Sequence, residues 1–491
     1  MGMPLKEWSS TLTVVDSIIG VSVLTLPSCY QQCGVILGSS LLICYSWLTY
    51  SSSLMLIKVA ILSNRKTYFG LAQVSYGIPG KLIVEISMIG LLLGTCTVFF
   101  TALEGLVARL FMMLTGSSIT KWHPVLLFSI ITAVSVLPLS LQKKVSNSAW
   151  QSLSSIAFCI LLMSVLMMNC LTLALSGGLE LEKVHLWHWS GITTCLPILT
   201  TTFCGHPLVL PIYFNFWAQP VSQINVAYKQ ANIIVVTCYT VVGLSGYLSY
   251  IKSVPRDILA ALPPSLVTDG IFLISLISSF PLIILPCRQA INTLLFEQQK
   301  EDGTFSVSGD MPFHRHVTCT VLIVYCTMVM GVLAPNVHST LAVMGTTTAS
   351  VICFISPSAI YAKLHKDTLR GRHNNATVLS RSRPTDSRWK SQQGKHKALL
   401  YCKTMIVLGV GILLLFIRAS SISELTEVEF LQQPIRKSLG AEGIGNANLT
   451  NRTKADEGVV EHHRPTAGGN LCTCKSVRGQ DNTWPTFNQS A

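Results

Sequence analysis

Asp16 is the first residue with a potential chemical role, because it is an acid inside the otherwise apolar stretch 11–33. Gly20 and Pro27 follow it, and both interrupt helices. Glycine loosens the backbone, and proline leaves the Val23 carbonyl without its usual N–H partner. A carboxylate in a low-dielectric environment costs at least about 2.5 kcal/mol, so a cation, a proton or a cavity is expected beside it. Asp16 is therefore the leading candidate for an ion site, and the alternative is a shallow position at a polar interface.

A second interrupted stretch spans residues 190–214 and contains Gly205, His206, Pro207 and Pro211. Its prolines free backbone carbonyls in the same way. Paired interruptions at corresponding positions of two halves are typical of transporters, which bind a solute between broken helices near the middle of the membrane. The two breaks together predict a binding site. His206 either contacts the solute, titrates or packs as a neutral side chain.

Three serines give a candidate cation site in a third stretch, residues 265–296. Ser275, Ser278 and Ser279 have the spacing of one helix face, and Pro281 frees the Ile277 carbonyl beside them. Hydroxyl and carbonyl oxygens suit a hard cation such as Na⁺. The alternative is that these serines only permit close helix packing.

The elements that must position these residues are membrane-spanning helices. Half of the 491 residues are apolar and only 12% are charged, where a soluble domain carries about 25%. Several apolar runs exceed the roughly 20 residues that cross a bilayer. We predict an all-α polytopic membrane protein with eleven spans, at residues 11–33, 35–62, 82–106, 123–142, 149–176, 190–214, 231–251, 265–296, 317–335, 337–362 and 399–417. A short helix is predicted between the second and third spans.

Charge asymmetry predicts the orientation. Ten of the 35 Lys and Arg residues lie in the polar insert 363–397, which the positive-inside rule places in the cytoplasm with residues 1–10. This asymmetry argues against a nucleic-acid partner for the net charge of +13. The polar tail 418–491 is then predicted to be disordered and luminal or extracellular. It contains three N-glycosylation motifs, at Asn448, Asn451 and Asn488. The sequence does not decide between the plasma membrane and an endomembrane.

Other polar residues receive no site role. Glu85 and Asp269 lie near predicted span ends and are interpreted as solvated or interfacial, and Arg288 is expected to reach the cytoplasmic side. Fourteen of the 16 cysteines lie in or beside apolar runs without metal-ligand spacing, so they are interpreted as small buried apolar side chains. Only Cys472 and Cys474 form a CxC pair in the tail. No metal site and no organic cofactor are predicted beyond a coupling ion.

Four runs carry a resemblance to a known family: DSIIGVSVLTLP, SMIGLLLGTC, HPLVLPIY and FPLIILPCRQAINTLLFEQQKEDGTF. They resemble the sodium-coupled neutral amino acid transporters of the amino acid/auxin permease group, over nearly all of residues 8–418. The resemblance implies a five-plus-five inverted repeat with broken helices 1 and 6. It also implies uptake of neutral amino acids by alternating access, coupled to Na⁺.

The resemblance also implies residue roles. The substrate would lie between helices 1 and 6, and Na⁺ between helices 1 and 8. The candidate substrate contacts are Gly20, Val21, Ser22, Gly205 and His206, and the candidate ion contacts are Asp16, Ile19, Ser278 and Ser279. Asp16 stands where the family usually has Asn, which admits H⁺ as the coupling ion.

Two alternatives to a transporter remain at this stage. An amino-acid sensor or scaffold would need the same pocket but would move little substrate. An intramembrane protease would need paired acids or a Ser-His pair on facing helices, and neither a GxGD nor a YD element is present. We therefore do not expect an enzyme.

Overall fold

The computed structural model describes residues 5–116, 128–142, 148–216, 221–251, 254–296, 312–334, 336–374 and 400–414. All regular secondary structure in these ranges is helical. Three of the segments predicted above fall wholly or partly in the gaps between these ranges or beyond them. They are residues 1–4 of the predicted N-terminal segment, the insert from 375 onward, and the tail with Asn448, Asn451 and Asn488. Residues 5–10 and 363–374 are described, and both continue helices, α1 and α14.

Each of the eleven predicted spans corresponds to a helix or an interrupted helix. Eight helical spans are long and apolar enough to cross a bilayer, one further span is a bent pair, and Phe128–Ser140 and Leu400–Leu414 are shorter apolar helices. The uninterrupted long helices are α3 (Val35–Ser63), α7 (Ser148–Leu175), α10 (Val221–Ser249), α11 (Leu266–Leu295) and α12 (Phe313–Leu333). The protein is a multi-pass integral membrane protein with the predicted all-α fold.

The first span is broken, as the sequence predicts. Helix α1 (Leu5–Ile18) ends at Ile18, and the 3₁₀ helix η1 (Val21–Thr25) leads into α2 (Leu26–Cys33) after a bend of 55°. The break therefore lies at Ile19–Gly20, before Pro27, which occupies the first turn of α2. The prediction that Pro27 leaves the Val23 carbonyl without a partner is wrong. This carbonyl is bonded, because it accepts the Leu26 N–H.

The sixth span is also interrupted. Helix α8 (Ile192–Thr202) ends before residues 203–205, and α9 (His206–Phe216) follows. Gly205 brings this break against the first one, because a Cβ on it would lie 3.0 Å from Ile18 Cγ1 and 3.2 Å from the Ser17 carbonyl oxygen. The two interruptions, far apart in the sequence, are in contact.

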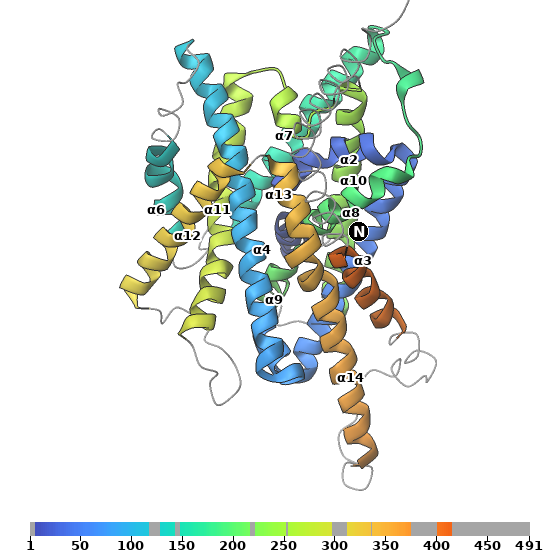
Figure 1. Ribbon diagram of the computed structural model, residues 1–491, viewed down its shortest axis with the longest axis vertical. Coiled ribbons are helices and arrows are strands. Elements are labelled where there is room, and N and C mark those ends of the chain that lie inside the picture. The colour runs from blue at the N-terminus through green and yellow to red at the C-terminus, as the bar shows by residue number, and fades with distance from the viewer. Residues whose placement is uncertain are drawn as a thin grey trace, which may run out of the picture. The chain divides into compact units, whose positions relative to one another are not determined.

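Helix α4 (Tyr68–Thr115) contains the predicted short helix. Gly77 has a left-handed φ of 69° and Pro79 follows, so the segment before Gly77 meets the long span at a kink. The long part of α4 packs against α11 and α12, which lie beside it in Figure 1. Helix α10 packs against α1, α2 and α7. These contacts hold the broken first span between two groups of long helices.

The last long span is not a regular α-helix. Helix α13 (Val337–Met344) continues through two π-helical turns, η6 (Gly345–Ala349) and η7 (Val351–Ile355), into α14 (Ser356–Asn374). Gly345 permits η6 to approach α8 closely, since a Cβ on it would lie only 1.7 Å from the Pro197 carbonyl oxygen. Wide π turns place side chains out of the ordinary helical register, and they are frequent at functional sites.

Three buried charged residues correct the sequence interpretation. Glu85, Asp269 and Arg288 have exposed fractions of 0%, 1% and 3%, so none is solvated. Glu85 pairs with Lys81 at 3.5 Å. Arg288 donates to the Ser140 and Gln142 carbonyls and thereby caps the carboxyl end of α6 (Leu137–Ser140). Ion pairs and hydrogen bonds within the protein, rather than water, compensate these charges.

Candidate functional site

A cavity of about 120 Å³ lies where the two interrupted spans meet. Residues 16–22 of the first span line it, together with Thr201, Cys204 and Leu208 of the sixth. A buried water needs roughly 10–15 Å³ of such space, so the cavity holds a ligand of about ten non-hydrogen atoms. The remaining wall is mostly apolar, with Leu91, Val98, Phe99, Phe158, Leu276, Leu282, Ile283 and Leu341.

The first break offers backbone donors to this cavity. The first hydrogen bond of η1 runs from the Val23 N–H to the Gly20 carbonyl at 3.2 Å. The N–H groups of Val21 and Ser22 precede that bond and lie at the amino end of a helix, where such groups lack an acceptor within the helix. Together with the helix dipole, they favour an anionic group such as a carboxylate.

The second break is poorer in donors. The Gly205 N–H bonds the Phe203 carbonyl at 3.0 Å, and the Leu208 N–H bonds the Gly205 carbonyl at 3.1 Å. Pro207 has no N–H at all. An anion is therefore held better at the first break than at the second. The sequence shows the missing N–H of Pro207, but the bonds that occupy the Gly205 and Leu208 N–H groups are seen only in the structure.

Tyr239 joins the carboxyl ends of both half-helices. Its hydroxyl lies 3.0 Å from the Ile18 carbonyl oxygen, at the end of α1, and 3.3 Å from the Thr202 carbonyl oxygen, at the end of α8. The tyrosine belongs to α10 and is fully buried, with Phe203 packed edge-on against its ring. A hydroxyl has one proton to donate, so it satisfies one of these two carbonyls at a time.

The predicted ion contacts are partly brought together. Asp16, Ile19 and Ser279 line the cavity, and Ser275 joins them, whereas Ser278 is not among the lining residues. Asp16 has an exposed fraction of 5%, so the alternative of a shallow interfacial acid is not observed. The Ser279 hydroxyl donates to the Ser275 carbonyl at 2.9 Å, so the oxygen that lines the cavity is held by a bond within α11.

Of the five predicted substrate contacts, three line the cavity and two do not. Gly20, Val21 and Ser22 line the cavity, whereas Gly205 and His206 do not. Gly205 packs against the end of α1, and His206 Nε2 lies 2.6 Å from Ser52 Oγ of α3. We therefore leave Gly205 and His206 out of the substrate pocket proposed below.

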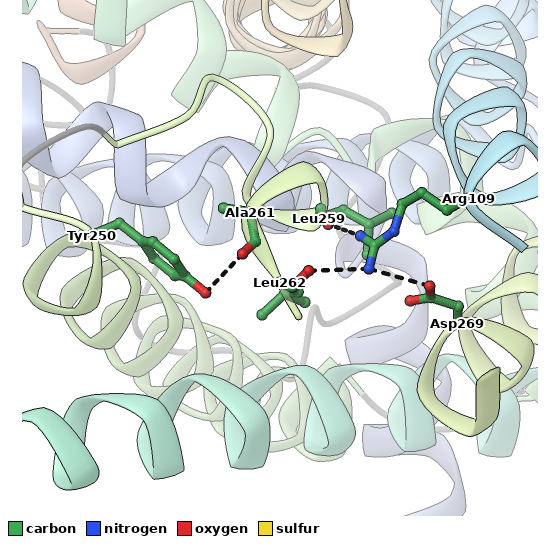
Figure 2. Close-up of polar contacts among 6 residues, drawn as sticks. All are labelled: Arg109, Tyr250, Leu259, Ala261, Leu262 and Asp269. Atoms are coloured by element: carbon green, nitrogen blue, oxygen red, sulfur yellow. Dashed lines mark hydrogen bonds and ion pairs between the residues drawn. The ribbon is translucent and has the colours of Figure 1, made fainter. Parts of the chain in front are cut away.

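A partly buried cation fixes the segment next to the first break. Figure 2 shows the Arg109 guanidinium donating to the Leu259 and Leu262 carbonyls and pairing with Asp269. The ion pair measures 3.2 Å, and Tyr250 donates to the Ala261 carbonyl at 3.1 Å. The 3₁₀ helix η5 (Ile258–Ala261), which is held in this way, packs against η1.

Asp257 begins η5 and is the one titratable residue of this segment with a clear shift. Burial raises the pKa of Asp257 from 3.8 to about 6, although its bond from the Leu259 N–H and the nearby Arg109 oppose the change. The η5 segment therefore contains an acid whose charged form is disfavoured in the folded protein.

Two interrupted spans around a shared cavity, in a bundle of long apolar helices, define a transporter fold. The chain belongs to the family described as transmembrane amino acid transporter protein, whose model matches residues 3–379. The crystal structure of MhsT in complex with L-phenylalanine has the same fold, with a TM-score of 0.52 at 12% identity. The similarity covers 83% of this chain and 97% of that one.

Curated relatives match the same region. "Solute carrier family 38 member 10" of Homo sapiens is 41% identical over 369 residues, which cover 74% of this chain and 33% of that protein. A Xenopus laevis protein, whose name includes "sodium-coupled neutral amino acid transporter 10", is 40% identical over 372 residues, 75% of this chain and 36% of that protein. "Amino acid transporter AVT6E" of Arabidopsis thaliana is 22% identical over 396 residues, 76% of this chain and 78% of that one. The chain thus spans about a third of the length of the first two relatives.

Proposed function

We propose that the protein is a secondary active transporter of neutral amino acids, which works by alternating access and is coupled to Na⁺ or H⁺. The observation that carries the proposal is the cavity between the two interrupted spans. Broken helices around a central cavity are how inverted-repeat transporters bind solute and ion. The names of the relatives support the amino-acid substrate and sodium coupling.

The substrate carboxylate is assigned to the Val21 and Ser22 N–H groups, because they lie at the amino end of η1, where an anion is favoured. The ammonium group is assigned to the carbonyl ends of α1 and α8. Tyr239 has one proton for the Ile18 and Thr202 carbonyls, so one acceptor is left for an N–H donor. The two charged ends of a zwitterion thus find opposite partners.

The side chain of the substrate is assigned to the apolar wall. Asp16 is the one charged side chain among the described residues that line the cavity. A cationic side chain would compete with the coupling ion for that carboxylate, and an anionic one would find no cation there. Neutral side chains of modest size, such as those of alanine and leucine, fit both the volume and the polarity.

The coupling ion is assigned to Asp16 and Ser279, with Ile19 as a backbone contributor. Na⁺ and H⁺ compete for a carboxylate in this environment. If Na⁺ is the productive ion, high Na⁺ relieves inhibition by acid. If H⁺ is productive, uptake persists at low pH without Na⁺. Asp16→Asn restores the side chain usual in the resembled family and removes the titration, so it flattens the pH dependence.

The test is uptake into liposomes with separate Na⁺ and pH gradients and a panel of amino acids. Accumulation of alanine or leucine against its gradient, with weak competition by lysine and arginine, is the expected result. Ser279→Ala should weaken activation by Na⁺. Ser278→Ala is the matched control, because Ser278 makes the same bond to the Ser275 carbonyl but is not among the cavity-lining residues. Binding without accumulation would instead support the sensor or scaffold alternative.

We also propose the predicted topology, with a cytoplasmic amino end and a tail on the opposite side. Glycosidase should then shift the mobility of the protein made in cells through Asn448, Asn451 or Asn488. Asn375, a further motif in the insert, should stay unmodified. Digestion of the tail by protease added outside intact microsomes would contradict this orientation.

A further inference from the structure

A second buried cluster lies at the interruption of the sixth span. The sulphur atoms of Cys204 and Cys353 and one ring nitrogen of His206 lie within 4.8 Å of one another. Cys204 and His206 flank the break, whereas Cys353 belongs to η7, far along the chain. The fold thus gathers metal-binding side chains that have no metal-ligand spacing in the sequence. For these two cysteines, the interpretation as mere apolar side chains is too simple.

The hydrogen bonds of His206 fit the tautomer that a metal ligand requires, with the proton on Nε2. Ser52 donates its hydroxyl proton to the Thr49 carbonyl at 3.2 Å. Its Oγ therefore accepts from the Nε2–H of His206, 2.6 Å away, and Nδ1 carries a lone pair. Nδ1 has no hydrogen-bond partner among the described residues, and the imidazole is 1% exposed. The ligand nitrogen of this imidazole and the two thiols of the cluster are gathered at one point, which is the arrangement of a metal site.

We propose that Cys204, His206 and Cys353 bind one Zn²⁺ ion. Thiolate and imidazole are preferred zinc ligands, and a zinc-bound imidazole commonly donates its other N–H to a neighbouring oxygen, as His206 does to Ser52. On binding, two Zn–S bonds and one Zn–N bond form, and the two thiols release their protons to solvent.

The charge of the two thiolates and the neutral imidazole favours a divalent over a monovalent metal ion. Two thiolates cancel the charge of Zn²⁺, and the imidazole stays neutral, so the occupied site is neutral overall. A monovalent soft ion on the same ligands would leave a net negative charge among buried residues, which is costly. Three protein ligands leave the fourth tetrahedral position for water or another ligand.

The geometry requires small adjustments and offers an entry route. Zn–S bonds of about 2.3 Å and Zn–N bonds of about 2.0 Å place tetrahedral ligands roughly 3.6–3.8 Å apart. From separations within 4.8 Å, side-chain movements on the order of 1 Å complete the site. Cys204 also lines the central cavity, so an ion in the cavity reaches the cluster without crossing the protein.

The test uses Co²⁺ as a spectroscopic probe on the purified, reduced and chelator-treated protein. All variants carry Cys472→Ser and Cys474→Ser, because the CxC pair could bind metal by itself. The parent should take up one equivalent of Co²⁺ with a thiolate-to-metal charge-transfer band, and Zn²⁺ should displace it. Cys353→Ser should lose the band. Cys402→Ser, which alters a buried cysteine outside the cluster, should retain it.

Three results would overturn the proposal of a zinc site. A reduced parent without the band has no thiolate site. A band that persists in both Cys204→Ser and Cys353→Ser lies elsewhere. A Cys204–Cys353 disulfide in unreduced protein, detected by mass spectrometry, together with no band after reduction, identifies a redox pair instead. His206→Gln, a buried polar substitution, checks that loss of the band follows loss of the imidazole while the variant still melts cooperatively.

A consequence for transport follows and rests on the proposed function. Zinc would tie the break of the sixth span to η7 and should reduce uptake in the parent but not in Cys353→Ser. The Co²⁺ measurement needs no transport. A protein that binds Co²⁺ but moves no amino acid would therefore refute the proposed function and leave the metal site intact.

Discussion

Replacing Tyr239 by phenylalanine tests whether the bridge between the two half-helices positions the binding cavity. The substitution removes only the hydroxyl, which reaches the Ile18 and Thr202 carbonyls at 3.0 and 3.3 Å. Because the ring is fully buried, water does not replace the lost donor. Leaving a buried carbonyl without its donor costs about 1–3 kcal/mol.

The hydroxyl keeps the ends of α1 and α8 in the arrangement that the substrate ammonium needs, so in the variant this energy is spent on restoring that arrangement and is lost from binding. At 1.4 kcal/mol for each factor of ten, about 1–3 kcal/mol corresponds to a loss of affinity of about 5- to 150-fold. The assay is equilibrium binding of radiolabelled alanine or leucine to the purified protein in Na⁺. The melting temperature of each variant is measured in parallel, since the lost bond also lowers stability.

Tyr45→Phe is the matched control. Tyr45 is 2% exposed, and its hydroxyl donates to the Leu196 carbonyl at 3.1 Å, inside α8 and before the break. Both variants should melt earlier than the parent, but only Tyr239→Phe should lose substrate affinity to the stated extent. If both lose the same affinity, or if neither does, the bridge contributes stability alone and does not position the cavity.

Three further predictions concern the surroundings of the cavity. Gly20→Ala should keep substrate binding and Gly20→Leu should abolish it, because a Cβ there meets nothing within 4 Å while a longer side chain fills the cavity. Arg109→Gln should lower the melting temperature more than the double change with Asp269→Asn, because the single change leaves a buried carboxylate without its cation. The amides of η5 should exchange hydrogen faster, after correction for intrinsic rates, as pH rises through about 6, and Asp257→Asn should remove this dependence.

The sign of the last prediction follows from the raised pKa. An acid whose pKa is higher in the folded protein than the ordinary 3.8 binds its proton more tightly when folded. Its protonated form therefore favours the folded segment, and that stabilisation is lost as pH rises from about 4 through 6. Exchange rates in η5 that fall with rising pH, or an unchanged profile in Asp257→Asn, would contradict the assignment.

Features that depend on residues close together in the chain could be predicted from the sequence. Glycine and proline act on their own backbone, and hydropathy is a property of each run, so both interruptions and the apolar helices follow from the printed residues. The details differ where tertiary packing decides them. Gly20 has an extended backbone with φ of −142°, which any residue adopts, so its glycine supplies room rather than conformational freedom. Pro27 starts α2 instead of breaking a helix.

Partners distant in the sequence could not be predicted. Tyr239 is one aromatic residue in an apolar span, and nothing near it indicates contact with Ile18. Asp269 was interpreted as solvated or interfacial because it appears alone in its own segment, yet it pairs with Arg109 in the fold. The same holds for Cys204 and Cys353. Such pairs depend on which helices pack together, and spacing along the chain carries no information on that.

Asp16 is a buried acid on the cavity wall, next to the break at Gly20. Its sequence context left two positions open, a site near the break and a shallow interface. The structure places it at 5% exposure on the cavity wall, which Ser279 of α11 also lines. A carboxylate in that position needs a positive partner, whereas the substrate carboxylate has backbone donors at Val21 and Ser22. Opposite charges are thus favoured on the two sides of Gly20. This separation gives a physical reason for a zwitterion and a cation to bind to the cavity together.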